Sequence, residues 1–157
     1  VSFDGLIGAH DNAMSAPDGA IKGRLAYARE LKITRGGVAV KTTLSSDRQD
    51  KIKELWEMIP VYLRHDAQKD DALIEFQSGG WLAAPNTPKD KIAAVRITRH
   101  GKPVTIVFDR ARRVQLSPVP VKRGNGFNRI LMVDLLDSGG ASATMPASAV
   151  ISYTISP

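Results

Sequence analysis

The sequence predicts an all-β fold, an antiparallel β-sandwich of about nine to eleven strands. The first observation is residues 92–117, where apolar and polar side chains alternate on both sides of a polar break. The second is residues 25–44, which alternate in the same way around a glycine turn at Arg35, Gly36 and Gly37. Successive side chains of a strand point to opposite faces, so this period of two indicates strands with one buried face.

Residues 92–117 predict a meander of three strands. The first strand ends near Arg99, and Gly101 supplies the conformational freedom for the reversal. The second strand is expected over residues 104–108. The charged residues 109–113 predict another turn, after which Val114 begins the third strand.

The part of the chain before the meander contains one ambiguous segment. Residues 1–8 predict a first strand, and residues 9–23, rich in Asp, Asn, Ser, Pro and Gly, predict a long loop. Between Ser45 and Ile59 the apolar spacing fits either a helix or a strand, and Pro60 ends a helix or marks a strand edge. We favour a turn followed by a long strand, because the surrounding sequence predicts strands.

Three further strands complete the prediction. A short strand is expected over residues 73–76, between a polar loop and two glycines. Residues 127–136 are apolar on both parities at their centre, which is typical of a central strand covered on both faces. Residues 150–155 predict a last strand, with Ile151 and Tyr153 on one side.

The composition is that of one globular domain, residues 1–157. The sequence begins with Val1 rather than Met, so we interpret it as a fragment of a larger protein. No apolar run approaches the about 18 residues of a membrane span, so we expect no membrane partner. The chain has no cysteine, which excludes disulfides and thiolate metal sites. The net charge of +6 permits an anionic partner.

The sequence predicts no catalytic residue, no metal site and no cofactor. The three histidines are far apart, whereas a zinc site needs several convergent ligands. No nucleophile elbow and no phosphate-binding loop is present. The nearest approach to an acid–base pair is His10 beside Asp11, since a carboxylate can orient an imidazole for proton transfer. The chain also lacks an aromatic-basic RNA motif and a recognition helix, which argues against nucleic acid as a partner.

Basic residues around the meander are the candidate ligand-binding site. Guanidinium groups bind carboxylates and sulfates with two parallel hydrogen bonds, so we expect an acidic partner. One of these residues lies on the first strand, two lie in the turn that follows it, and two lie in the next turn at the opposite end of the meander. Only an extended chain along the strands could therefore reach all of them. The predicted site comprises Arg96, Arg99, Lys102, Arg112 and Arg113.

Residues 25–64 resemble the β-sandwich modules of heparinase II/III-like and alginate-lyase-like polysaccharide lyases. The similar features are a Tyr-x-Arg-x-Leu strand beginning at Tyr27, a glycine turn, and a strand that ends in an aromatic residue and a proline. The resemblance implies a C-terminal sandwich that follows a helical toroid in a secreted or periplasmic enzyme. The catalytic His, Tyr, Asn and Arg of that family have no residue-by-residue match here.

The resulting expectation is a non-catalytic accessory module of a carbohydrate-active enzyme, in contact with an acidic polysaccharide or with the catalytic domain of the parent protein. One alternative is a purely structural or assembly module. The other is a small lyase or hydrolase that uses His10 and Asp11.

Overall fold

The computed structural model describes residues 2–7, 20–47, 51–64, 72–117, 121–123, 126–136 and 141–157. Every regular element in these ranges is a β-strand, and the strands there pair antiparallel, so the predicted fold class is confirmed. The thirteen strands in these ranges exceed the predicted number because four have only two or three residues. The strands are β1 (Ser2–Ile7), β2 (Ala20–Thr34), β3 (Gly37–Ser46), β4 (Lys51–Ile52), β5 (Trp56–Arg64), β6 (Leu73–Gln77), β7 (Trp81–Ala83), β8 (Lys89–Arg99), β9 (Lys102–Leu116), β10 (Val121–Arg123), β11 (Gly126–Asp134), β12 (Ala143–Thr144) and β13 (Ser148–Ser156).

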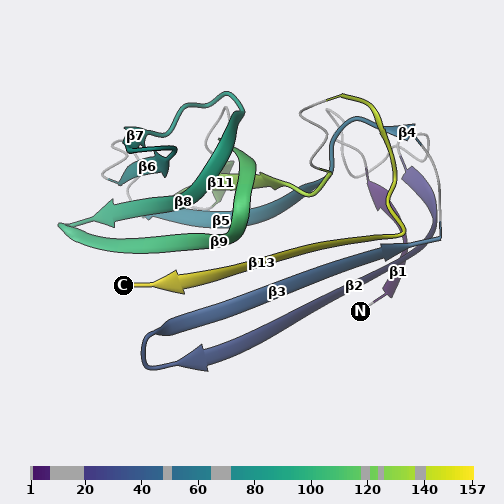
Figure 1. The fold of residues 1–157 in the computed structure, drawn as a ribbon, viewed down its shortest axis with the longest axis horizontal. Coiled ribbons are helices and arrows are strands. Elements are labelled where there is room, and N and C mark those ends of the chain that lie inside the picture. Colours follow the sequence, from purple (N-terminus) through teal and green to yellow (C-terminus); the bar gives the residue numbers. More distant parts are fainter. Residues whose placement is uncertain are drawn as a thin grey trace.

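The larger sheet folds into two layers that share one long strand (Figure 1). One layer has the order β1-β2-β3-β13-β9-β8-β6-β7. The other consists of β5, β11 and β10, and it joins the first through β9. Strand β9 pairs with β13 at Phe108 and, farther along, with β11 at Val114. The strand therefore passes from one layer to the other, and the core lies between them.

Strand β9 passes between the layers because it bends. The prediction of a turn over residues 109–113 is wrong, since β9 continues through these residues. Ala94 of β8 pairs with Val107, and Ile92 pairs with Arg112, so two steps along β8 correspond to five along β9. The extra residues form an irregular bulge, and bulges bend and twist the strand that carries them. Charged residues in this segment therefore mark a bent strand and not its end.

The β2–β3 hairpin has the predicted strands and glycine turn. Thr34 pairs with Gly37 across the two residues Arg35 and Gly36. Gly37 has a φ of 144°, and a Cβ built there would lie 2.1 Å from the carbonyl oxygen of Ile155. Only glycine fits this position, because the hairpin packs directly against the backbone of β13. Strand β2 begins at Ala20, so the predicted loop over residues 9–23 is too long at its end. Residues 8–19 lie outside the described part.

The ambiguous segment between Ser45 and Ile59 contains strands in its described residues, so the helical alternative is wrong. Strand β3 extends to Ser46, and β5 begins at Trp56. Within the described chain β5 pairs only with β11, which makes it an edge strand. Pro60 is tolerated there because its missing N–H falls where no ladder partner is required.

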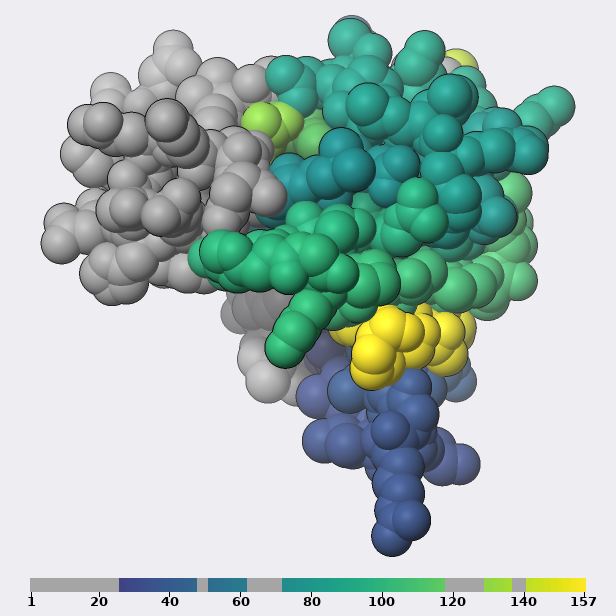
Figure 2. Space-filling view, turned by 90° about the vertical axis from the view of Figure 1, so that its left-hand side faces the viewer, coloured from purple at the N-terminus to yellow at the C-terminus, as the bar shows by residue number. Residues whose placement is uncertain are grey.

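The main core draws on both layers. Four of its residues, from β8, β9, β11 and β13, have no exposed surface or almost none: Val95, Val114, Leu131 and Ile151. The central position predicted for residues 127–136 is confirmed, since β11 lies between β5 and β9. A second, smaller cluster around Leu44, Leu55, Met145 and Ala149 closes the other end of the sheet. At the opposite end the β2–β3 hairpin extends beyond the body of the molecule (Figure 2).

Candidate functional site

The predicted basic residues near the β8–β9 turn lie on two different faces. Arg99 pairs with Lys102, and both share the parity of the buried residue Val95. Arg96 has the opposite parity, so its side chain leaves the outer face of the sheet. These three residues are close in sequence but do not form one continuous binding surface.

Arg96 is engaged by its neighbours on that outer face. Its Nε donates a hydrogen bond to Oε2 of Glu75 at 2.8 Å, and its Nη2 lies 2.8 Å from the same oxygen. Its guanidinium carbon lies 4.3 Å from the centre of the Trp81 ring. Such cation–π contacts contribute about 0.5–1 kcal/mol at exposed sites. Arg96 therefore covers the aromatic face that a sugar ring would need.

The two remaining predicted residues lie at the far end of β9 and differ in accessibility. Arg112 has a relative exposure of 1%, donates to Oδ1 of Asp109 at 2.9 Å and donates to the carbonyl oxygen of Val150 at 3.2 Å. It is part of the β9 bend and cannot reach a ligand on the surface. Arg113 is mostly buried and lies 3.9 Å from Oδ1 of Asp90. The structure thus does not bring the five basic residues together.

A partly buried polar cluster joins the two layers, with Thr42 and Glu57 buried and the Arg29 side chain 37% exposed. Arg29 of β2 donates through Nη2 to Glu57 of β5, whose relative exposure is 4%. Thr42 of β3 accepts from Nε of Arg29 at 3.2 Å and donates to the same Glu57 oxygen at 3.2 Å. Buried polar groups require such partners, because an unpaired one costs about 1–3 kcal/mol. The cluster fixes β2 and β3 against β5.

Tyr153 of β13 borders this cluster, and its pKa indicates whether the cluster could take part in acid–base chemistry. The pKa of Tyr153 is raised to about 12; burial is the largest cause, the negative charge of Glu57 adds to it, and Arg29 acts in the opposite direction. Burial alone would lower the pKa of Arg29, but Glu57 and the neighbouring phenols raise it above its usual value. A phenol with a raised pKa is a poor base at neutral pH, and a relative exposure of 5% keeps substrates away. The cluster is structural.

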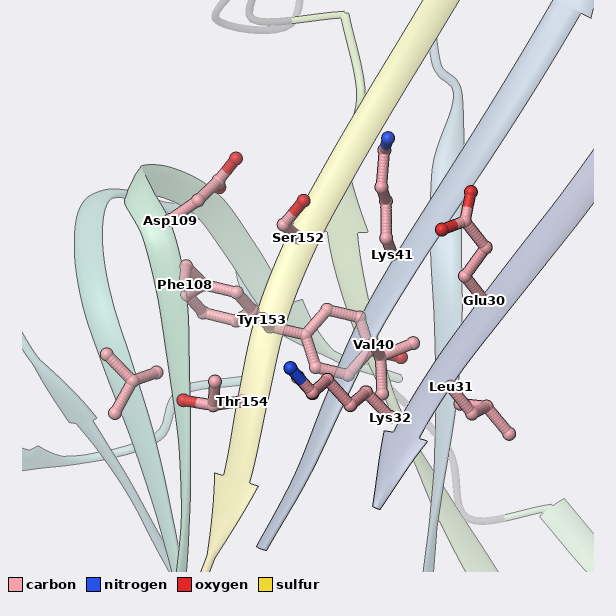
Figure 3. Close-up of a pocket in the computed structure, with 12 residues that line it drawn as sticks. Glu30, Leu31, Lys32, Val40, Lys41, Phe108, Asp109, Ser152, Tyr153 and Thr154 are labelled. Carbon is pink, nitrogen blue, oxygen red and sulfur yellow. The ribbon is translucent and has the colours of Figure 1, made fainter. Parts of the chain in front are cut away.

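A groove of about 420 Å³ lies across β2, β3, β13 and β9. Most of its lining residues have the parity opposite to that of the core residues Val40 and Tyr153, so they belong to the outer face. Figure 3 shows Glu30, Lys41, Ser152 and Asp109 following one another across the four strands. The lining residues on the outer face are Glu30, Lys32, Ala39, Lys41, Val107, Asp109, Ser152 and Thr154.

The side chains of the groove divide into a floor and walls. Ala39, Ser152 and Thr154 are short, and they occupy adjacent positions on β3 and β13. Lys32 and Lys41 supply two positive charges, and the register places Glu30 directly opposite Lys41. Short residues between long charged ones leave a trough that runs across the strands. Its hydroxyl, ammonium and carboxylate groups can bind a polar ligand.

The described residues contain no metal-binding cluster. No group of three or more His, Asp or Glu side chains in these ranges could hold a metal ion. His100 is exposed at the β8–β9 turn, while His10 and Asp11 lie outside the described residues. Nor does that part of the chain include a helix long and apolar enough to cross a membrane.

Sequence reasoning missed both Glu57 and the groove, for different reasons. Glu57 occupies the parity of Leu55, Ile59 and Val61, and a charged residue at an apolar position is a recognisable signal of a buried ion pair. The groove had no comparable signal, because its residues come from strands that pair only after folding. Comparisons of the chain with protein families, curated proteins and solved structures give no match.

Proposed function

We propose that this chain is a non-catalytic accessory β-sandwich module of a carbohydrate-active enzyme and that its groove contacts an acidic polysaccharide. The groove crosses four strands, is open along its length and has a floor of short side chains, and this observation carries the proposal. A trough of this form suits an extended polymer better than a small substrate, for which pockets are usually enclosed.

The groove carries two lysines and two carboxylates, and the lysines are the groups that support an acidic ligand. Lys32 and Lys41 are positioned to contact carboxylates or sulfates, and the hydroxyl groups of Ser152 and Thr154 can bond sugar hydroxyls. Glu30 and Asp109 accept hydrogen bonds from the same hydroxyls. The net charge of +6 adds a long-range attraction for a polyanion. An acidic face of the parent's catalytic domain would satisfy the same groups.

The proposal that the parent enzyme is a polysaccharide lyase rests on the resemblance of residues 25–64. This range includes β3, β4, β5 and residues 25–34 of β2. The ligand site differs from the predicted one. It lies on the outer face of β2, β3, β13 and β9 and includes none of the five predicted basic residues. Because Arg112 is buried, variants at that position would report on stability and not on binding.

Binding to the groove is tested by titrating the chain with alginate, heparin and a neutral glucan at two salt concentrations. Exposed charge pairs contribute about 0–1 kcal/mol each and salt screens them, so we expect weak binding to the acidic polymers that falls steeply with salt. Lys41→Ala should weaken it by removing a charge, and Ser152→Phe should weaken it by filling the floor. Lys102→Ala, an exposed lysine at the β8–β9 turn, is the control.

Two results would contradict the proposal. Equal affinity for the neutral glucan would show that the lysines do not select the ligand. Unchanged heparin and alginate binding in both Lys41→Ala and Ser152→Phe would place any binding elsewhere on the surface. Circular dichroism of each variant would establish that its fold is intact.

A further inference from the structure

The floor of the groove continues past β13 along the outward-facing residues of β9 and β8. Ala39 pairs with Thr154, and Thr154 pairs with Val107 of β9. Thr105 is the next outward-facing residue on β9, and it pairs with Arg96 of β8. The strands β3, β13, β9 and β8 are consecutive neighbours in the sheet (Figure 1). A path of short, uncharged side chains therefore leads from the groove to Arg96.

Positive charges stand at both ends of this path. Lys32 of β2 lies opposite Ala39 at one end, and the guanidinium of Arg96 lies at the other. Neighbouring strands are about 4.8 Å apart, so the path from β2 through β3, β13 and β9 to β8 spans about 19 Å. A small anion cannot contact both ends at this separation, whereas an extended chain with repeated acid groups can.

The Arg96 side chain is held in place by its neighbours. Its Nε and Nη2 both contact Oε2 of Glu75 at 2.8 Å, and its guanidinium carbon lies 4.3 Å from the centre of the Trp81 ring. Nη1 takes no part in the contact with Glu75, and the side chain has a relative exposure of 33%. Ordering a long side chain on binding costs about 0.5–1.5 kcal/mol. Glu75 and Trp81 have already restricted Arg96, so much of this cost is avoided.

Glu75 also limits the affinity of this end of the path. Its carboxylate offsets part of the positive charge that an acidic ligand would meet at Arg96. A glutamine in its place would keep an oxygen that accepts the hydrogen bond from Nε, but it would carry no negative charge. Removing this charge should therefore strengthen the binding of an acidic chain.

We propose that the ligand path of the groove extends across β9 to Arg96, and that Arg96, positioned by Glu75 and Trp81, binds an acid group of the polysaccharide chain that contacts Lys32 and Lys41. This inference rests on the proposed function, because it requires an acidic chain in the groove. It adds a basic contact on β8, sets a minimum length for the ligand and assigns Glu75 a role in setting the affinity.

Opposite effects of the two partners of one ion pair test the proposal in titrations with polymeric alginate at low salt. Arg96→Gln should lower the affinity about fivefold, the effect of one exposed charge pair, and Glu75→Gln should raise it by a similar factor. Lys102→Gln removes a positive charge from the same hairpin on the opposite parity, and it should change the affinity little. An ion pair that served only the stability of β6 and β8 would give no gain with Glu75→Gln.

Alginate oligomers graded by length test whether one chain reaches both ends. Oligomers shorter than about 19 Å contact one end at a time, whereas longer ones make the second contact at a high effective concentration. The affinity of the native chain should therefore rise steeply once the oligomers reach this length. In Arg96→Gln this rise should disappear.

The variants separate failure of this path from failure of the groove. Weaker binding in Lys41→Ala and Ser152→Phe, with unchanged binding in Arg96→Gln and Glu75→Gln, would overturn the path and leave the groove in place. Unchanged binding in all four variants would overturn the groove as well. Weaker binding in both Arg96→Gln and Glu75→Gln would show that the ion pair only supports the fold, and it would also overturn the path.

Discussion

The two long hairpins of this fold, β2–β3 and β8–β9, have similar sequence patterns but different surroundings. Both alternate apolar and polar residues around a turn that contains glycine. The β8–β9 hairpin bends between the layers, so Val95 and Val114 are completely buried. The β2–β3 hairpin is regular in register and projects, so Leu31 and Ile33 on its inner parity are mostly exposed. Alternation therefore indicates a strand and its faces, but not whether another layer covers them.

The difference originates in the charged residues along each hairpin. Strand β9 carries Asp109 and Arg112 inside its bulge, where the buried guanidinium is paired and the strand bends toward the second layer. Strand β2 carries Arg29, whose partner Glu57 belongs to the second layer. This ion pair fixes the hairpin to the second layer at Arg29, several residues before the hairpin turn at Arg35 and Gly36. Beyond Arg29, the described residues of the hairpin make no further polar contact of this kind with the second layer, and the hairpin projects from the body of the molecule (Figure 2).

The largest expected effect concerns the turn of the projecting hairpin. Gly37→Ala must shift the backbone, because its Cβ would lie 2.1 Å from the carbonyl oxygen of Ile155 at a φ of 144°. Strain and overpacking together should lower the free energy of unfolding by about 4 kcal/mol. Gly36→Ala is the matched control, since its nearest atom is 3.9 Å away. Chemical denaturation of both variants makes the comparison, and similar losses would mean that the hairpin does not pack on β13 as described.

The next effect concerns the bend of the other hairpin. Arg112→Ala removes a fully buried side chain with its contacts to Asp109 and Val150, so we expect a loss of about 3 kcal/mol. Arg110→Ala, an exposed arginine in the same bulge, should change stability by less than about 0.5 kcal/mol. If the two variants were equally stable, the charged segment would be a surface turn after all.

The two hairpins also show how much of the fold and of the groove could be predicted from the sequence. Local alternation and turn glycines were sufficient for the strands on both sides of Arg35 and Gly101, and for the last strand with Ile151 and Tyr153 inward. The bend was not predictable, because a run of charged residues is typical of turns and the burial of Arg112 depends on strands distant in sequence. The groove was not predictable either. Its register joins residues 30–41 to residues 107–109 and 152–154, and no local pattern encodes the pairing of β3, β13 and β9.

The smallest effect concerns the place where the two hairpins meet β13. Tyr153 is opposite Val40 of β3 on one side and Phe108 of β9 on the other, with its ring edge-on to Phe108. Burial raises its pKa from 10 to about 12. Below pH 10 the phenol is protonated in both the folded and the unfolded chain, so its full contribution to stability is present. Between pH 10 and about 12 the unfolded phenol ionises first, and the free energy of unfolding must fall.

Tyr153→Phe isolates this contribution, because subtracting the variant from the native chain cancels the titration of every group that does not interact with the phenol. The difference in the free energy of unfolding should be constant up to about pH 10 and then shift toward the variant by up to about 2 kcal/mol. The near-ultraviolet absorbance of tyrosinate should contain a late-ionising component in the native chain, and the variant should lack that component. A difference that stays constant to pH 12 would mean that the phenol is exposed, and that β13 does not join the two hairpins through a closed interior at this point.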